Sequence, residues 1–305
     1  MTAPDPVTSE AQASDFAKLA TGGLGPVAER PRYGTVMSGV IVAMAAIWLG
    51  WTASRNTAFG WPVVAEYLFS AEILQGLFVT LWMTAVVVIL GFALGCGIAI
   101  LGLSNNPVLR PIAAGYIWIF RSTPILVQLL FWYNIGYLIP NASVGFPFGP
   151  ELFSIDTKNV VTANVAAILG LTFHEAAYAA EIVRGGILSI DRGQTEGGKA
   201  LGLSSTVIFF HIVLPQAVRN MLPPAGNLII GTLKGTSIVS VIAVSDLLYS
   251  AQLIYNRTYE IVPLLLVATI WYMVITTVLA AAQRYLERRF NTRRNEGVTM
   301  MVPGK

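Results

Sequence analysis

The residue types that could perform catalysis in this chain stand in incomplete patterns. His174 and Glu175 begin a sequence similar to the helical zinc signature of metalloproteases, but Tyr178 occupies the position of the second histidine ligand. The segment around Ser237 lacks the final glycine of a nucleophile elbow, and no acid or histidine is arranged to activate the hydroxyl. The only other histidine is His211, which makes a histidine-rich zinc site implausible. We expect no catalytic residue and no metal site.

The chain also lacks a nucleotide site of its own. Gly226 and Gly231 have the gap of a phosphate-binding loop. Threonine and leucine follow Gly231, however, at the positions where such a loop requires lysine and then serine or threonine. We expect this chain to bind no cofactor and to be unable to hydrolyse ATP alone.

Charged side chains within apolar segments are further candidates for function. A charge at membrane depth costs about 2.5 to 3.5 kcal/mol and normally faces a cavity or a partner. Lys234 lies in such a segment, and the nearby Thr236 and Ser237 suit a pathway in which the lysine meets a substrate carboxylate. A structural ion pair between Lys234 and an acid is an equally good interpretation. His174 and Glu175 lie in another apolar segment, where they could meet the ammonium group of a zwitterion.

Three more charged residues have different predicted roles. Glu181 and Arg184 are three residues apart on one helical face, which favours a structural ion pair. Arg121 lies within or at the edge of another apolar segment, three residues before Pro124. Because proline disfavours helical geometry at the residue before it, we expect a kink or an unwound turn there. We assign Arg121 and Pro124 to the pathway, in gating or shape and not in specificity.

The composition places these residues in a membrane. Of the 305 residues, 55% are hydrophobic and only 11% are charged, which leaves too little polar surface for a soluble domain. Apolar runs of roughly the length that crosses a bilayer as a helix, about 20 residues, lie at 36–53, 76–103, 111–139, 160–182, 224–245 and 261–282. The sequence therefore predicts an all-helical integral membrane protein with about six transmembrane helices.

Two local patterns refine these helices. Gly91 and Gly95 have a four-residue spacing of small residues that lets two helices approach closely. Pro215, Pro223 and Pro224 interrupt a long apolar stretch, and proline removes a backbone donor from a helix interior. We expect an entering helix at 206–216 and a new helix that starts at Pro224, where the missing donor is tolerated.

Lysine and arginine counts predict the orientation, because positively charged loops remain in the cytoplasm. Thirteen of these residues fall in the two tails and in the second and fourth loops, whereas the alternate loops hold three. Both termini are therefore expected in the cytoplasm. The loop between the fourth and fifth spans is expected on the same side.

That loop contains the most specific pattern in the chain. Glu196 is followed six residues later by Gly202, and then by Leu214 and Pro215. This spacing resembles the Glu-Ala-Ala loop in the permease subunits of binding-protein-dependent ABC importers. Further similarity to the polar amino acid branch of this family lies at 120–128, 177–187, 193–194, 214–219 and 234–237. The resemblance covers roughly residues 73–289.

The resemblance implies a type I importer core of five helices at 73–289, with an extra transmembrane helix at 36–53. Residues 1–35 and 290–305 would be cytoplasmic tails. The chain would translocate a polar amino acid or a related small solute across a bacterial cytoplasmic membrane. Its partners would be cytoplasmic ATPase subunits that bind ATP and magnesium, a second permease copy or a homologous permease, and an extracytoplasmic solute-binding protein. No nucleic acid partner is implied.

The resemblance also assigns coupling to the ATPase to the loop at 185–215. The coupling residues are Gln194, Glu196, Gly197, Gly198, Gly202, Leu214 and Pro215. A short helix there would enter a groove on the ATPase, with Glu196 capping it or pairing with a cation of the partner, and Gly202 ending it. Gly197 and Gly198 stand where the family has two alanines. Each lowers helix propensity by about 1 kcal/mol, so we expect a helix that is frayed until it is bound.

Two other classes of protein compete with this interpretation. An ATP-independent secondary carrier would explain the charges within the membrane, but it gives no reason for the spacing of the loop. A membrane-embedded hydrolase lacks a complete set of catalytic residues. Dependence of transport on a separate ATPase distinguishes the importer from both.

Overall fold

The computed structural model describes residues 33–145 and 151–299. The chain divides into two compact units, residues 1–56 and residues 57–305. Helices make up nearly all of the described residues in both units, and the described strands form a single hairpin. The predicted helical fold class is therefore confirmed.

The first unit contains helix α2 (Tyr33–Arg55). The part from residue 37 onward is long and apolar enough to cross a membrane, as the sequence predicted for 36–53. At its end, the Arg55 guanidinium lies 4.7 Å from the centre of the Trp51 ring. The tail predicted at 1–35 falls almost wholly outside the described residues.

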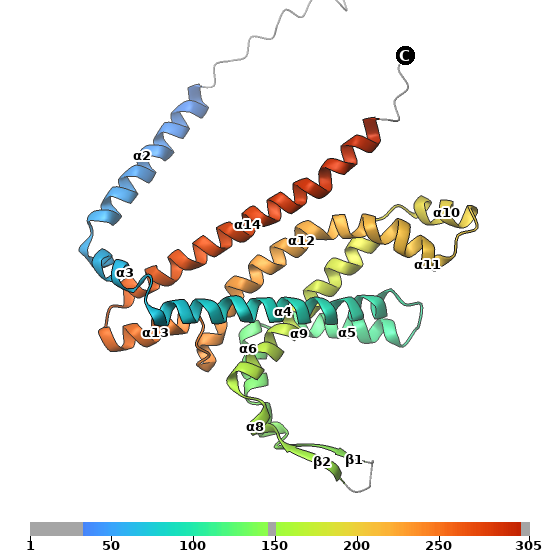
Figure 1. The fold of residues 1–305 in the computed structure, drawn as a ribbon, viewed down its shortest axis with the longest axis horizontal. Coiled ribbons are helices and arrows are strands. Elements are labelled where there is room, and N and C mark those ends of the chain that lie inside the picture. Colours follow the sequence, from blue (N-terminus) through green and yellow to red (C-terminus); the bar gives the residue numbers. More distant parts are fainter. Residues whose placement is uncertain (1–32, 146–150, 300–305) are drawn as a thin grey trace, which may run out of the picture. The chain divides into compact units, whose positions relative to one another are not determined.

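The second unit begins with short segments and is dominated by long helices (Figure 1). The longer helices are α4 (Ala71–Leu103), α5 (Leu109–Ser122), α9 (Ala163–Leu188), α12 (Leu214–Gly235), α13 (Leu247–Thr258) and α14 (Ile261–Thr299), and α5 is followed by the shorter α6 (Ile125–Tyr133). The shorter elements are η1 (Thr57–Phe59), α3 (Trp61–Tyr67), α7 (Ile135–Leu138), α8 (Thr157–Val160), α10 (Arg192–Ala200), α11 (Ser205–Val207), the π-helical η2 (Ile208–Val213) and the 3-10 helix η3 (Thr236–Ile242).

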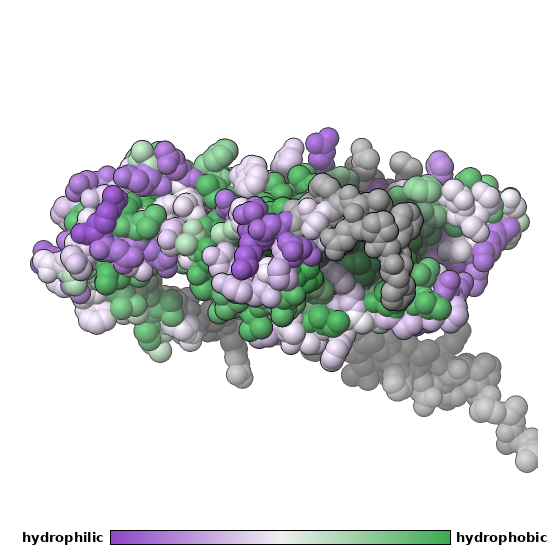
Figure 2. All heavy atoms as spheres, turned by 90° about the horizontal axis from the view of Figure 1, so that it is seen from below, coloured by the Kyte–Doolittle hydropathy of each residue, from purple (hydrophilic) through white to green (hydrophobic). Residues whose placement is uncertain are grey.

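The described helices agree with the predicted number of membrane spans. Five helical stretches are long and apolar enough to cross a membrane, and the bent pair α5–α6 makes a sixth if it is one span. Large apolar side chains are exposed over much of the surface of the second unit, as expected where helices face lipid (Figure 2). Helix α14 continues to Thr299, so it enters the range 290–305 in which the sequence predicted a tail.

The break between α5 and α6 is the kink predicted at Pro124. The two helices meet at an angle of 102°, and Thr123 between them has extended backbone geometry. The buried Gln128 side chain holds this turn, because its amide nitrogen donates to the Phe120 carbonyl and the Thr123 carbonyl, both at 2.9 Å, and to the Thr123 hydroxyl at 2.7 Å. A backbone carbonyl freed by the break thus has a partner within the protein.

The break predicted at the other prolines is wrong. A helical stretch runs from residue 205 to residue 242, and α12 passes through Pro223 and Pro224 without ending. Pro215 lies in the first turn of α12, directly after the π-helical η2, and it too is within the continuous helical stretch. Gln283 of α14 donates to the Pro223 carbonyl at 3.2 Å, so a neighbouring helix supports the proline pair.

The close approach predicted for Gly91 and Gly95 joins α4 to α9. A Cβ atom at Gly95 would lie 2.7 Å from the Cβ of Ala179 and 2.9 Å from the carbonyl oxygen of Ala176. A Cβ atom at Gly91 would lie 3.1 Å from the Cβ of Glu175. Because α9 carries the charged residues singled out by the sequence, this contact also positions them.

The sequence did not predict the antiparallel hairpin of β1 (Asn141–Gly145) and β2 (Glu151–Asp156). The hairpin follows α7, and the predicted third span at 111–139 ends just before it. Asp156 at its end caps α8 by accepting a hydrogen bond from the N–H of Lys158 at 3.0 Å. The hairpin therefore leads directly into the helices that precede α9.

Asp246 is a buried carboxylate that joins two helices, α13 and α14. Its side chain caps α13 by accepting from the N–H of Tyr249 at 2.8 Å, and it accepts from the Tyr272 hydroxyl of α14 at 3.2 Å. The adjacent N–H of Leu247 donates to the Thr80 hydroxyl of α4 at 3.0 Å. Burial raises the pKa of Asp246 from 3.8 to about 6.

This raised pKa predicts a pH dependence of stability. The folded protein binds a proton on Asp246 more tightly than the unfolded chain does, so its stability falls as pH rises from about 4 to about 6. Two pKa units correspond to about 3 kcal/mol. We expect thermal unfolding in detergent to show this loss for the native chain and a flatter profile for Asp246→Asn, which keeps an acceptor for the helix cap. Equal slopes for the two proteins between pH 4 and 6 would contradict the assignment.

Candidate coupling helix and polar pockets

Helix α10 lies in the loop predicted at 185–215, between α9 and α12 (Figure 1). Asp191 caps its first turn by accepting a hydrogen bond from the N–H of Gly193 at 2.7 Å. Glu196 lies within the helix and does not cap it, which corrects one of its two predicted roles. Gln194 and Glu196 are both exposed, so a partner can reach them.

The C-terminus of α10 has the geometry predicted for Gly202. This glycine has a φ of 76°, in the left-handed region that other residues resist. Its N–H donates to the Lys199 carbonyl at 2.9 Å, and the N–H of Leu203 donates to the Gly198 carbonyl at 3.1 Å. This pair of bonds is a Schellman motif, which ends a helix with its last carbonyls satisfied.

The two glycines in the middle of α10 have different surroundings. Gly198 is buried, and a Cβ atom there would lie 2.8 Å from Cγ1 of Ile208. Gly197 is exposed, with no atom within 4 Å of an added Cβ. The structure has a helix here despite both glycines, with caps at its two ends, and the fraying predicted for the unbound helix stays a prediction.

This difference predicts opposite outcomes for two alanine substitutions. Gly197→Ala should stabilise α10 by about 1 kcal/mol, because alanine restricts the unfolded backbone and meets nothing in the folded helix. Gly198→Ala should lose this gain, since Ile208 has to shift. Hydrogen exchange of the α10 amides measures the effect, with about fivefold greater protection expected in Gly197→Ala. Equal protection in the two variants would contradict the packing of Gly198.

A second match to a phosphate-binding loop occurs within α10. Gly193, Gly198 and Lys199 have the spacing of such a loop, but Ala200 stands where a hydroxyl residue is required. The segment is a helix that follows another helix, whereas a phosphate-binding loop connects a strand to a helix. Its structural setting therefore does not support a nucleotide site.

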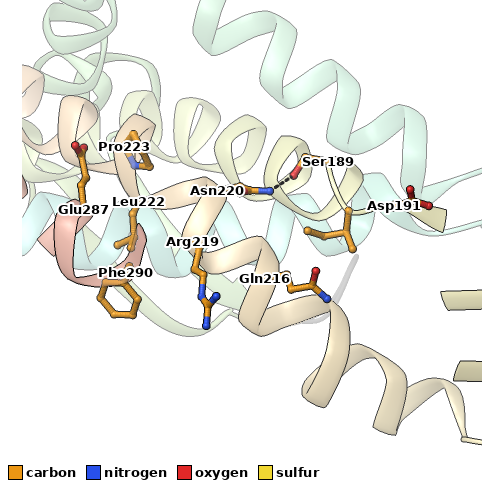
Figure 3. A pocket seen from close by; sticks show the side chains of 10 residues that line it. Ser189, Asp191, Gln216, Arg219, Asn220, Leu222, Pro223, Glu287 and Phe290 are labelled. Carbon is orange, nitrogen blue, oxygen red and sulfur yellow. Dashed lines mark hydrogen bonds between the residues drawn. The ribbon is translucent and has the colours of Figure 1, made fainter. Parts of the chain in front are cut away.

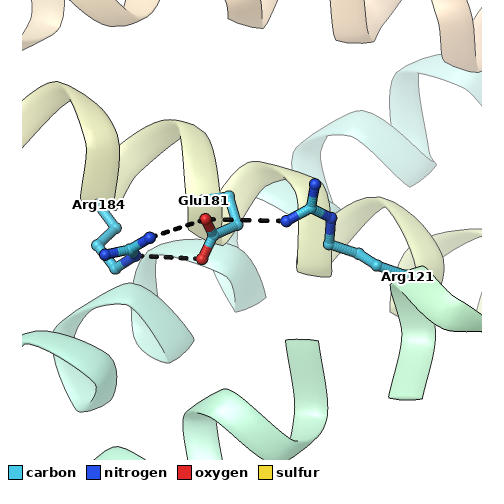
Figure 4. Close-up of polar contacts among 3 residues, drawn as sticks. All are labelled: Arg121, Glu181 and Arg184. Carbon is cyan, nitrogen blue, oxygen red and sulfur yellow. Dashed lines mark hydrogen bonds and ion pairs between the residues drawn. The ribbon is translucent and has the colours of Figure 1, made fainter. Parts of the chain in front are cut away.

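A cluster of three charged side chains contains the ion pair predicted between α9 residues (Figure 4). Arg184 donates to both oxygens of Glu181, with distances of 3.1 Å from Nε and 2.9 Å from Nη2. Arg121, from the last turn of α5, lies 3.8 Å from Glu181 and 5.3 Å from the centre of the Tyr178 ring. The cluster contains two guanidinium groups for one carboxylate.

The other predicted pathway residues are not gathered at one place. Lys234 is exposed and forms no ion pair with the acidic residues that the structure describes. Ser237 is half-buried and donates to the Lys234 carbonyl at 2.8 Å. Thr236 is fully buried and donates to the Leu233 carbonyl, so it lines no surface of this subunit. The structural pairing considered for Lys234 is absent from the described residues.

His174 and Glu175 lie one to two turns before the charged cluster on α9. Glu175 is only 8% exposed, and its Oε2 atom has no hydrogen-bond partner among the described residues. His174 is half-buried, its ring lies 5.0 Å from that of Tyr178, and its Nδ1 atom likewise has no described partner. Such unsatisfied buried polar atoms fit a site that a polar ligand completes.

Two pockets lie near the α10 end of α9. The first, of about 610 Å³, lies between the α9–α10 turn, α12 and α14 and is lined by Asp191, Arg219 and Glu287 among others (Figure 3). The second, of about 590 Å³, is lined by Arg121 and Glu181 of the charged cluster in Figure 4. Ser189 and Asn220 line both pockets and are joined by a hydrogen bond of 2.8 Å.

The sequence analysis missed several residues that organise these sites. Asp191 precedes a helix as capping residues do, and this signal was available. Gln128 lies four residues after Pro124, but its contact with the preceding turn depends on the bend between two helices. Ser189 and Asn220 are separated by 31 positions, so sequence spacing gives no sign of their contact.

Relatives of the chain share its fold and much of its sequence. The arginine transport system permease protein ArgU of Corynebacterium glutamicum is 41% identical over 257 residues, which cover 84% of this chain and 79% of that protein. The probable glutamine ABC transporter permease protein GlnP of Bacillus subtilis is 34% identical, with coverage of 70% and 92%. The crystal structure of an amino acid ABC transporter with histidines aligns with a TM-score of 0.63 and 32% identity, covering 74% of this chain and 97% of that one.

The family model for binding-protein-dependent transport system inner membrane components matches residues 91–292. This range contains α10, the charged cluster and the two pockets. The chain is therefore a member of the family of inner membrane components of binding-protein-dependent transport systems, as the spacing of its loop indicated.

Proposed function

We propose that the chain is the permease subunit of an ABC importer for a polar amino acid, driven by a separate ATPase subunit. The observation that carries this proposal is helix α10, which is capped at both ends and presents exposed polar residues between two membrane spans. A preformed helix on a membrane protein suits insertion into a partner's groove. ATP and magnesium would bind to that partner, and this chain would have no catalytic residue.

The proposed orientation places α10 in the cytoplasm with both termini. The support for it is the concentration of lysine and arginine in the tails and in the loops on this side. A second permease copy or a homologous permease would complete the pathway in the cytoplasmic membrane. A solute-binding protein would deliver the substrate from the opposite side.

The names of the relatives support an amino acid as the substrate, since they include arginine and glutamine transport permeases. The buried Glu175 is suited to an ammonium or guanidinium group, because its unpartnered oxygen can accept a hydrogen bond from such a cation. We propose that the substrate is a polar amino acid and that arginine is the first to test.

Reconstitution tests the proposal. Vesicles containing this chain, its ATPase and its binding protein should accumulate labelled arginine only with ATP, and an inactive ATPase variant should abolish uptake. A screen of amino acids for stimulation of ATP hydrolysis would then identify the preferred substrate. Arginine accumulation by vesicles that contain this chain alone would favour the secondary carrier and contradict the proposal.

A further inference from the structure

We propose that the pocket containing Arg121 is a carboxylate-binding subsite for the transported amino acid. The subsite lies at the α10 end of α9 and is separate from the buried Glu175. This inference rests on the proposed function, because it assumes that an amino acid passes through the chain. It replaces the gating role that the sequence suggested for Arg121 with a role in binding.

The charge of the three-residue cluster is the first feature that favours a carboxylate ligand. Both oxygens of Glu181 accept hydrogen bonds from Arg184, which satisfies that carboxylate. Arg121 is 3.8 Å from Glu181, beyond hydrogen-bond distance, and its side chain is 44% exposed. One positive charge is therefore in excess at the wall of the pocket, because neither oxygen of Glu181 accepts a hydrogen bond from Arg121.

The position of Arg121 is the second feature that favours a carboxylate ligand. The residue lies in the last turn of α5, where the helix dipole favours a cation, and its guanidinium lies over the Tyr178 ring. These contacts hold the side chain without using its hydrogen-bonding capacity. An arginine held in this way matches the two oxygens of a carboxylate better than a lysine would.

The size and the lining of the pocket are the third feature that favours a small-molecule ligand. Its volume of about 590 Å³ is within the range of about 300 to 1,000 Å³ that is usual for small-molecule sites. Beside Arg121 and Glu181, its lining includes the polar side chains of Asn220, Asn227 and Ser189, while most of the remaining lining is apolar. Asn220 and Ser189 also line the pocket of Figure 3, so the subsite borders that pocket close to α10.

Equilibrium binding to the assembly of permease and ATPase, without the binding protein, tests the subsite directly. The probes are arginine and arginine amide, in which a neutral amide replaces the carboxylate. The native assembly should bind arginine at least about tenfold more tightly than its amide, since a charge-assisted bidentate pair is lost. In Arg121→Gln the affinity for arginine should fall to that for the amide, while the affinity for the amide should not change.

Matched variants control for folding and for charge. Arg110→Gln removes an exposed arginine from the same helix and should keep the native preference for arginine. Arg121→Lys keeps the charge and should retain part of the preference. The assignment of the subsite is wrong if Arg121→Gln prefers arginine over its amide as strongly as the native assembly does. It is also wrong if Arg121→Gln prevents pairing of the permease subunits. ATP-driven arginine uptake by the native assembly would still support the proposed function in either case, whereas absence of uptake and binding for every amino acid would overturn both.

Discussion

Leucine in place of Gly95 should lower the free energy of unfolding of this protein by about 3 kcal/mol, the upper end of the range for overpacking. Even a Cβ atom at this position would lie 2.7 Å from Ala179 and 2.9 Å from the Ala176 carbonyl. One of these atoms belongs to the α9 backbone, so the two helices have to separate. Unfolding in detergent and the yield of folded protein in the membrane measure the effect.

Gly97→Leu is the matched control for this prediction. Gly97 is two residues away on the same helix, is exposed, and has no atom within 4 Å of an added Cβ. The two variants gain the same side chain and lose the same glycine, so they differ only in what the leucine meets. Similar destabilisation in both would mean that α4 and α9 do not pack as the structure shows.

Valine in place of Gly202 should reduce ATP-driven uptake by about fivefold to thirtyfold while leaving the amount of protein in the membrane unchanged. The φ of 76° costs a residue other than glycine about 1 to 2 kcal/mol, and a β-branched side chain is especially unfavourable. This cost acts on the Schellman motif that ends α10 and therefore on the fraction of formed helix. Transport in vesicles measures the loss.

Asparagine at position 202 separates backbone conformation from side-chain bulk. Asparagine adopts the left-handed region more readily than other residues, and no atom lies within 4 Å of an added Cβ at this position. Gly202→Asn should therefore keep most of the uptake. An equal loss in both variants would indicate a direct contact of the glycine with a partner, and native uptake in Gly202→Val would argue against α10 as the coupling element.

The sequence predicted those features whose causes are local. Apolar length identified the spans, the glycine spacing identified a close approach of α4 to another helix, and Gly202 identified the end of α10. Pro124 marked a true break because no helical bond crosses it and Gln128 supports the unwound turn. These features depend on a few neighbouring residues, which the sequence displays directly.

Features that depend on distant partners could not be predicted in the same way. Pro223 and Pro224 have the same local preferences as other prolines, but α12 continues through them in a position supported by Gln283 of α14. The excess positive charge at Arg121 arises because Arg184 donates hydrogen bonds to both oxygens of Glu181. Lys234 was predicted to be a pathway residue or a member of an ion pair because it lies deep in an apolar run. Depth in such a run does not indicate which side chains surround the lysine.

The side-chain amide of Gln128 makes the bend between α5 and α6 rigid. Three acceptors at the end of α5 share this one donor group on α6, so the angle cannot open without breaking several bonds together. Because the bend is rigid, a tilt of α6 would move the end of α5 sideways, and Arg121 would move with it. A displacement of α6 would thereby be converted into lateral travel of a guanidinium group.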